Sequence, residues 1–423
     1  MPQPESDDPP LLAPPFPLFW AARVCSALGY QIAAVAVGWF VYDRTRNAYD
    51  LGWLGLCQFL PVVLLTLVAG QVADRYDRRR IVTICQLVEG AVFAALASAA
   101  WLNRLSVAEV FAAMSLLGAA RTFEGPTLSA LLPAIVPERI LHRAIAVSSS
   151  AMQTATIVGP SLGGLLYAAG VKIPLALSAA LFLAASTCVS RIPLDHPAPK
   201  REPATLKTVF SGIAFVRGRP VILGVISLDL FAVLLGGVTA LLPVFARSIL
   251  HAGPWALGLL RSAPAVGALA MSAVLSRRSL GGHVGMKMLI AVIVFGVATV
   301  VFSASRNLAL SLAALAMLGA ADNVSVVIRS SLVQLSTPDA MRGRVNAVNS
   351  LFIGTSNQLG EFESGMTAGF MGPIAAGIFG GVGTIVVALL WMRLFPSLRR
   401  LSTLAAVQPE AEEKPQELTT APG

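Results

Sequence analysis

Residues 286–305 read MKMLIAVIVFGVATVVFSAS and contain one charged side chain, that of Lys287. About 20 mostly apolar residues in a helix cross the hydrocarbon core of a bilayer, which is about 30 Å thick. The whole chain shares this character: 56% of its 423 residues are hydrophobic, 13% are charged, and the mean hydropathy is +0.74. Soluble domains are about 45–50% apolar and about 25% charged. Because the chain has too few polar residues to cover a soluble domain, we expect an all-α polytopic membrane protein.

Apolar stretches of the same kind recur along the chain and predict twelve transmembrane helices. The predicted spans are 17–42, 51–73, 81–101, 107–129, 144–168, 174–191, 220–245, 255–276, 286–305, 308–332, 344–369 and 373–395. The breaks between them divide the chain into five parts. These are an N-terminal tail (1–15), a six-helix bundle (16–191), a linker (192–219), a second six-helix bundle (220–400) and a C-terminal tail (401–423).

The linker and the C-terminal tail differ in composition from the bundles. Thr205–Arg217 mixes apolar and basic residues at helical spacing, which predicts an amphipathic helix at the membrane surface. The tail is rich in Glu and Pro, which predicts disorder.

The basic residues lie mostly on one side of the predicted membrane. If both termini are cytoplasmic, the cytoplasmic segments hold 21 of the 31 Lys and Arg residues, the other side holds six, and four fall inside spans. Cytoplasmic loops carry such an excess, so we expect both termini in the cytoplasm and the chain in the bacterial inner membrane. The net charge of +9 is spread over loop ends, which argues against a nucleic-acid partner.

The two predicted bundles resemble each other in sequence. Leu117-Gly118-Ala119-Ala120 returns 201 residues later as Leu318-Gly319-Ala320-Ala321, and Gly159 meets Gly360 at the same offset. This repeat predicts two homologous halves of six spans each, with pseudo-symmetry. Transporters are often built in this way, with the substrate site between the halves. The alternative is that apolar helices resemble one another through composition alone.

The loop between the second and third spans, residues 70–80, reads GQVADRYDRRR. It resembles the signature of the major facilitator superfamily at this position, which the chain matches at Gly70, Asp74, Arg75, Arg78 and Arg79. The family pattern usually has a second glycine where this chain has Asp77. The resemblance implies twelve helices in a 6+6 arrangement. It also implies a contact of Gly70 and Asp74 with the eleventh span, near Arg344, that closes the cytoplasmic side. Alternatively, the arginines only follow the charge bias of cytoplasmic loops.

The fifth span contains Gly159-Pro160-Ser161-Leu162-Gly163-Gly164. These residues are similar to the core of the superfamily's antiporter motif, through Gly159, Pro160, Gly163 and Gly164. Small residues let helices approach closely, and proline allows a bend. The alternative is ordinary close packing. Phe123–Pro126 and Leu241–Ala246 resemble the branch that includes the enterobactin exporter and macrolide efflux proteins, which implies export of a siderophore-like or drug-like molecule.

Charged residues inside spans are functional candidates, because a charge in the bilayer is unfavourable unless it is paired or hydrated. The candidates for proton coupling are Asp229, Glu89, Glu361 and Glu363, and those for an intramembrane charge pair or gate are Arg121, Glu124, Asp322, Arg329 and Arg261. All four histidines lie in loops or at span ends, so a carboxylate is expected to carry the proton. Asp229 and Glu89 lie near mid-membrane and rank first.

Two of these groups carry geometric expectations. Glu361 and Glu363 are two residues apart and cannot both face a cavity, because a helix has about 3.6 residues per turn. Arg121 and Glu124 are three apart and can form a local ion pair. Alternatively, pseudo-symmetry places Asp322 opposite Arg121, which predicts a gate between the halves.

These observations favour a proton-driven secondary exporter that works by alternating access as a monomer, with a small-molecule substrate, protons and the lipid bilayer as partners. An importer on the same fold and a non-transporting receptor or scaffold remain open. No paired His/Asp metal motif or nucleophile elbow is found, and Gly281–Gly285 lacks the Lys-Ser/Thr of a phosphate-binding loop. We therefore expect neither an enzyme nor a cofactor.

Overall fold

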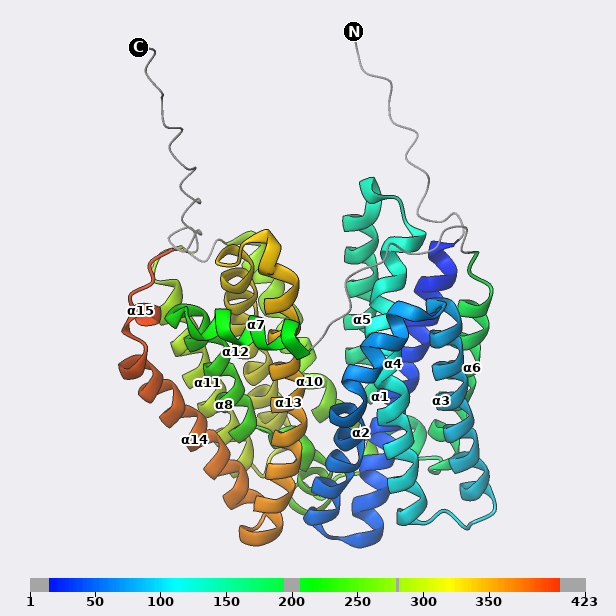
Figure 1. Cartoon of the computed structure of the whole chain (residues 1–423). Coiled ribbons are helices and arrows are strands. Elements are labelled where there is room, and N and C mark those ends of the chain that lie inside the picture. Colours follow the sequence, from blue (N-terminus) through cyan, green and yellow to red (C-terminus); the bar gives the residue numbers. More distant parts are fainter. Residues whose placement is uncertain (1–14, 194–205, 279–280, 404–423) are drawn as a thin grey trace, which may run out of the picture.

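The structure is a computed structural model that describes residues 15–193, 206–278 and 281–403. The predicted N-terminal tail, most of the predicted C-terminal tail and residues 194–205 of the linker lie outside this range. The described part is built from helices, arranged as two bundles side by side (Figure 1).

The first bundle contains six helices. They are α1 (Phe16–Thr45), α2 (Ala48–Arg75), α3 (Arg78–Trp101), α4 (Val107–Ile135), α5 (Glu138–Tyr167) and α6 (Lys172–Ser190). Local sequence explains where several of them begin. Asn47 caps α2 by accepting a hydrogen bond from the Tyr49 amide, and Ser106 and Glu109 form a reciprocal capping box at the start of α4.

The second bundle follows α7 (Leu206–Arg217). Its elements are α8 (Pro220–Leu235), η1 (Val238–Leu241), α9 (Leu242–Val244), η2 (Phe245–Ile249), α10 (Pro254–Arg277), α11 (Val284–Ala304), α12 (Leu308–Leu335), α13 (Asp339–Met371), α14 (Pro373–Leu394) and α15 (Pro396–Arg399). The helix α7 occupies the segment expected to be amphipathic. It packs on α13 through Gly212, where an added Cβ would lie 3.0 Å from the Arg344 carbonyl oxygen.

The expected membrane-protein class is confirmed. In the described part of the chain, nine helices are long and apolar enough to cross a membrane. The elements α8, η1, α9 and η2 together count as one of them. The long helices α4, α5 and α13 complete the twelve spans of the predicted 6+6 arrangement.

The pseudo-symmetry of the halves is visible in their packing. The start of α12 lies 201 residues after the start of α4, and α13 starts 201 residues after α5. Within the first bundle α2 packs on α4 and α3 on α6, and in the second bundle the equivalent pairs are α10 with α12 and α11 with α14. Between the bundles, α2 packs on α13 and, symmetrically, α5 packs on α10. The repeat therefore reflects a shared fold and not composition alone.

The seventh span differs from the prediction, which treated 220–245 as one continuous helix. The helix α8 ends at Leu235, and after Gly236 and Gly237 the chain continues as the short elements η1, α9 and η2. An added Cβ at Gly237 would lie 2.7 Å from the Gly360 carbonyl oxygen in α13. The break thus lets two backbones meet at the interior of the bundle, where irregular backbone is tolerated in a membrane protein.

The two halves pack closely together on one side. We call the side where α1 begins and α14 ends the near side, at the top of Figure 1, and the opposite side the far side. On the far side Gly365 of α13 faces Gly52 of α2 so closely that an added Cβ would clash, and Gly258 of α10 faces Pro160 of α5.

On the near side a polar groove separates α5 from α10 and α12. It is lined by Ser149, Ser150, Gln153, Thr154, Ile157, Ala268, Leu269, Ser272 and Asn323. No described atom lies within 4 Å of an added Cβ at Gly70, Gly343 or Gly354, all on the near half of their helices. The molecule is therefore closed on the far side and open on the near side.

Candidate functional site

A cavity lies between the two halves, near the middle of the bundle. Helices α1, α2, α3 and α4 supply the wall from the first half, and η1, α9, α10 and α13 supply the wall from the second. Most of the wall is apolar and includes Leu51, Leu54, Phe93, Met114 and Leu117. Small-molecule sites are typically apolar cavities with a few placed polar groups.

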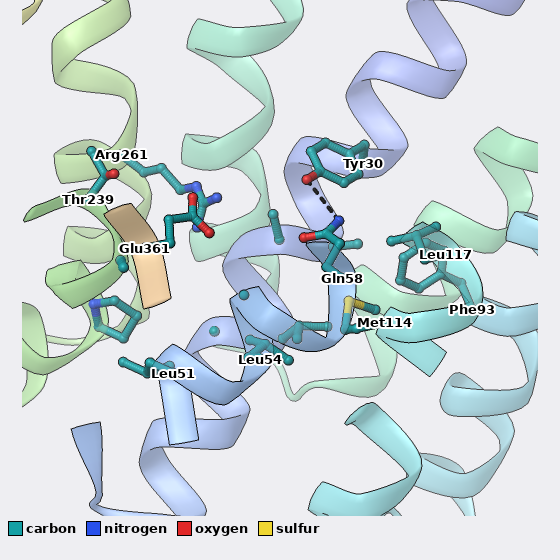
Figure 2. Close-up of a pocket in the computed structure, with 17 residues that line it drawn as sticks. Tyr30, Leu51, Leu54, Gln58, Phe93, Met114, Leu117, Thr239, Arg261 and Glu361 are labelled. Atoms are coloured by element: carbon teal, nitrogen blue, oxygen red, sulfur yellow. Dashed lines mark hydrogen bonds between the residues drawn. The ribbon is translucent and has the colours of Figure 1, made fainter. Parts of the chain in front are cut away.

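The polar groups of this cavity face each other across the interface between the halves. On one wall, the Gln58 amide nitrogen donates a hydrogen bond of 3.1 Å to the Tyr30 hydroxyl. On the other wall lie the side chains of Arg261 and Glu361, with Thr239 beside them (Figure 2). The cavity can therefore offer a substrate a cation, a carboxyl group, an amide and a phenol.

The structure distinguishes Glu361 from Glu363. Glu361 lines the cavity, and an added Cβ at Gly55 of α2 would lie 3.4 Å from its Oε2 atom. Glu363 lies outside the cavity wall and accepts a hydrogen bond of 2.7 Å from the Thr367 hydroxyl. Of these two proton-coupling candidates, only Glu361 lines the central cavity.

A second set of candidates lies inside the first bundle, between α1, α3 and α4. Glu124 Oε1 accepts hydrogen bonds of 2.9 Å from both Ser26 and Gln86, and Glu124 Oε2 lies 3.9 Å from Arg121 Nη1. The Arg121–Glu124 contact is the local ion pair expected from their spacing. Glu89 is completely buried beside them.

This charge cluster contacts the central cavity through Tyr30. The guanidinium carbon of Arg121 lies 3.9 Å from the centre of the Tyr30 ring, a cation–π geometry. Tyr30 is also a wall residue of the cavity. One aromatic side chain therefore separates the cavity from the buried charges.

The second bundle holds its own buried charges, between α8 and α12. Asp229 and Arg329 form an ion pair in which both side chains are buried. Asp322 lines a smaller cavity next to Asp229, together with Phe295 and Ser325. Pairing with Arg329 gives Asp229, the first-ranked proton candidate, a structural partner.

The Arg121–Asp322 contact that was the alternative expectation for a gate is not formed in this structure. Arg121 contacts Glu124 and Tyr30, whereas Asp322 lies in the cavity beside Asp229. The pseudo-symmetry does relate the two positions, but each side chain is directed into its own bundle. Gln58 of α2 and Arg261 of α10 instead line the central cavity from opposite halves.

The loop between α2 and α3 has a well-defined geometry. Asp77, at the position of the family's second glycine, has φ −59° and caps α3 by accepting a hydrogen bond from the Arg79 amide. Asp77 therefore does not need the positive φ that favours glycine. Arg78 Nη1 donates to the Ala130 carbonyl at 3.3 Å and Arg79 Nη1 to the Ile192 carbonyl at 3.0 Å.

The expected contact of this loop with the eleventh span is not formed at Gly70, because the near side is open and no described atom lies within 4 Å of an added Cβ. Arg75 is exposed at the end of α2, and the side chain of Asp74 lies outside the described part of the structure.

The glycines of the fifth span serve two different contacts. Gly159 and Gly163 face α1, where added Cβ atoms would lie 2.6 Å from Gln31 Cβ and 2.8 Å from the Ile32 carbonyl oxygen. Gly164 and Pro160 face α10 at Gly258. The motif therefore packs α5 both within its own bundle and against the other half.

Sequence reasoning missed a polar contact that joins the halves on the far side. Arg247 Nη2 of η2 lies 3.2 Å from Asp43 Oδ1 of α1, and the hydroxyls of Tyr42 and Ser248 are 2.7 Å apart. It also missed Tyr30, Gln58 and Thr239 as cavity residues. The signals were present, because Tyr30 and Gln58 are polar residues inside apolar spans and Thr239 follows the Gly236-Gly237 break.

Two six-helix bundles related by pseudo-symmetry, with one cavity between them that is closed on one side, define a membrane transporter of the major facilitator superfamily. The comparison with known proteins agrees. The chain belongs to the family described as "Transmembrane secretion effector", whose profile matches residues 6–420.

Individual relatives are more distant. The chain is 26% identical over 388 residues to the enterobactin exporter EntS of Citrobacter koseri, which covers 92% of this chain and 93% of the relative. It is 24% identical over the same length to the enterobactin exporter EntS of Escherichia coli O139:H28.

Similar solved structures support the fold. A bacterial homolog of the human lysosomal transporter Spinster, in an inward-facing and unoccupied conformation, has a TM-score of 0.72 and 13% identity, covering 92% of this chain and 99% of that one. A bacterial homologue of the iron transporter ferroportin, in an inward-facing state, has a TM-score of 0.69 and 15% identity, covering 91% and 98%.

Proposed function

We propose that the chain is a proton-driven exporter that moves a small siderophore-like or drug-like molecule out of the bacterial cytoplasm by alternating access. The observation that carries the proposal is the cavity between the halves, which are packed together on the far side and apart on the near side. Rocking of one bundle against the other exposes such a site to each side in turn.

The direction rests on two further points. The relatives named above are exporters, and the positive-inside bias places the near side in the cytoplasm. On this basis the structure corresponds to an inward-facing state, ready to accept substrate from the cytoplasm. The chain would act as a monomer in the inner membrane, because each copy contains the complete cavity.

The chemistry of the cavity supports an amphiphilic substrate. Most of the residues in its wall are apolar, and Arg261, Glu361, Gln58 and Tyr30 provide the polar contacts. A catecholate siderophore of the enterobactin type offers aromatic rings and hydrogen-bonding oxygens to such a wall, and an amphiphilic drug offers rings and a polar group.

Transport in reconstituted vesicles tests the proposal. Purified protein in liposomes that hold an imposed pH gradient should accumulate enterobactin, and a protonophore should abolish the accumulation. Orientation-specific proteolysis of the tails then assigns the direction. Accumulation only with proton flow in the same direction as the substrate would favour the importer, and binding without movement would favour the receptor.

A matched pair of variants tests the site. Glu361→Gln should weaken transport, because it changes the charge at the cavity wall, whereas Glu363→Gln should not, because Glu363 lies two residues away and outside the wall. Equal effects of the two substitutions would contradict the assignment of the cavity as the substrate site.

A further inference from the structure

Glu89 is the most isolated carboxyl group in the first bundle. It lies in the middle of α3 with 0% of its surface exposed, and neither of its carboxyl oxygens has a hydrogen-bond partner among the described residues. A buried charge without a partner is so unfavourable that the group takes up a proton instead. A protonated carboxyl group carries an O–H that can donate a hydrogen bond.

Glu124 is the acceptor available to it. Gln86, which lies one turn before Glu89 on α3, donates a hydrogen bond of 2.9 Å to Glu124 Oε1, so the two carboxyl groups are neighbours, and Glu124 is itself 3% exposed. Glu124 already receives hydrogen bonds from Ser26 and Gln86 and faces Arg121. Glu124 therefore has hydrogen-bond donors around it and Glu89 has none, so we place the proton on Glu89. Two carboxyl groups this close bind and release protons as a pair.

We propose that Glu89 and Glu124 form a carboxyl pair that binds one exchangeable proton, and that this pair is the proton site of the transport cycle. The role of the pair in the transport cycle rests on the proposed function, whereas the binding of one proton by the pair does not. Within the described chain, the other charged or titratable groups that face the pair are Arg23 of α1, Arg121 of α4 and Cys85 of α3, with Tyr30 behind Arg121.

The contact between Arg121 and Tyr30 links this proton to the substrate. Tyr30 lies between the cavity and Arg121, and its hydroxyl is bonded to Gln58 on the same wall. A substrate that presses Tyr30 and Arg121 towards Glu124 stabilises the charged form of the pair. The proton then leaves Glu89 for water. The Arg121 side chain, which is 33% exposed, marks the route to solvent. Substrate binding and protonation therefore oppose each other, as an antiporter requires.

The other buried acids lack this combination. Asp229 is held by Arg329 in an ion pair, and Asp322 lines a cavity that shares no residue with the central one. Glu361 lines the central cavity, but it lies near Arg261 and belongs to the substrate wall.

Infrared spectroscopy of the purified protein tests the pair without any substrate. The carbonyl band of a protonated carboxyl group should be lost when the pH is raised. This loss should be missing from Glu89→Gln and from Glu124→Gln, since either substitution leaves a single carboxyl group. Glu109→Gln is the matched control, because Glu109 lies on the same helix as Glu124 and glutamine preserves its capping bond to Ser106.

An unchanged pH-dependent band in both Glu89→Gln and Glu124→Gln would overturn the proposal. If Glu89→Gln does not fold, the Glu124→Gln spectrum decides, because the pair needs both members. Glutamine closely resembles a protonated glutamate, so Glu89→Gln should keep the wild-type melting temperature.

Transport separates this inference from the proposed function. Glu89→Gln in liposomes should still exchange enterobactin in counterflow, which needs no net proton movement, but with a raised KM because glutamine mimics the protonated state that opposes substrate binding, and it should lose accumulation driven by a pH gradient. Gradient-driven accumulation at the wild-type level in this variant would remove the pair from the cycle. If the wild-type protein itself shows no proton-driven accumulation, the proposed function fails, and the infrared result alone judges the carboxyl pair.

Discussion

The substitution Gly258→Ala should shift the transporter away from the conformation described here. Gly258 of α10 packs on α5, and an added Cβ would lie 2.5 Å from the Pro160 carbonyl oxygen and 3.0 Å from Ser161 Cα. An ordinary contact is 3.4–4 Å, and both neighbours are backbone atoms that cannot rotate away. The two helices must therefore separate on the far side.

The size of the effect follows from the crowding. Overpacking of a well-packed contact costs about 1–3 kcal/mol. If the far side opens during transport, the open state avoids this clash, so the ratio of the two states should change by about 5- to 150-fold. The exchange of Gly for Ala inside a helix changes helix stability by about 1 kcal/mol, but equally in both states.

Spin-label distances measure this shift. Labels at Ile145 of α5 and Val274 of α10, both exposed on the near side, report the width of the near-side opening in a background without the four native cysteines. Gly258→Ala should move the distance distribution towards shorter values as the near side closes. Gly354→Ala is the matched control, since no described atom lies within 4 Å of its added Cβ in this state. Identical distributions for Gly258→Ala and the wild type, with both proteins folded, would refute the reasoning.

Three further predictions concern single contacts. Arg329→Met should lower the free energy of unfolding by about 3–5 kcal/mol, because it leaves Asp229 buried without a partner; thermal unfolding in detergent measures this, and a double variant with Asp229→Leu should recover most of the loss. Asp43→Asn removes the ion pair with Arg247, whose side chains are 38% and 40% exposed, so the far-side contact should weaken by only about 0.2–1 kcal/mol. A far-side spin-label distance that responds to salt in the wild type but not in Asp43→Asn would support this, and an equal response in both would contradict it. Tyr30→Phe removes one hydrogen bond of the cavity wall, worth about 0.5–1.5 kcal/mol, and should raise the KM for enterobactin about 2- to 10-fold without loss of proton coupling; a loss of coupling would show that the hydroxyl, not the ring, transmits the signal.

Several parts of the architecture could be predicted because they depend on local sequence. Apolar length predicts each span, and the offset of 201 residues predicts that α12 and α13 repeat α4 and α5. The pairing of Arg121 with Glu124 also follows from spacing on one helix. The break in the seventh span was missed because a hydropathy pattern does not register an interrupted backbone. Its glycine pair was nevertheless visible at Gly236-Gly237.

The candidate site was harder to predict, because a charge inside a span says only that some partner exists. Asp229 and Glu89 both lie near mid-membrane in apolar helices, and composition treats them alike. The structure separates them: Asp229 pairs with a guanidinium, whereas Glu89 has no hydrogen-bond partner among the described residues and lies one turn from Gln86, which binds Glu124. Which of the two can exchange a proton depends on that difference, and it arises from how α3, α4, α8 and α12 pack.

The amino-acid sequence alone is enough to predict a membrane protein of twelve helices in two related halves, since burial of the backbone in lipid depends on segment length and composition. Only the tertiary structure decides which polar side chains meet. Tyr30 and Gln58 face Arg261 and Glu361 across one cavity, and Arg121 remains within its own bundle, away from Asp322. The physical reason is that these partners come from helices far apart in the chain. Their contacts are set by helix rotation and by glycine-mediated approach between the bundles, which no local pattern records.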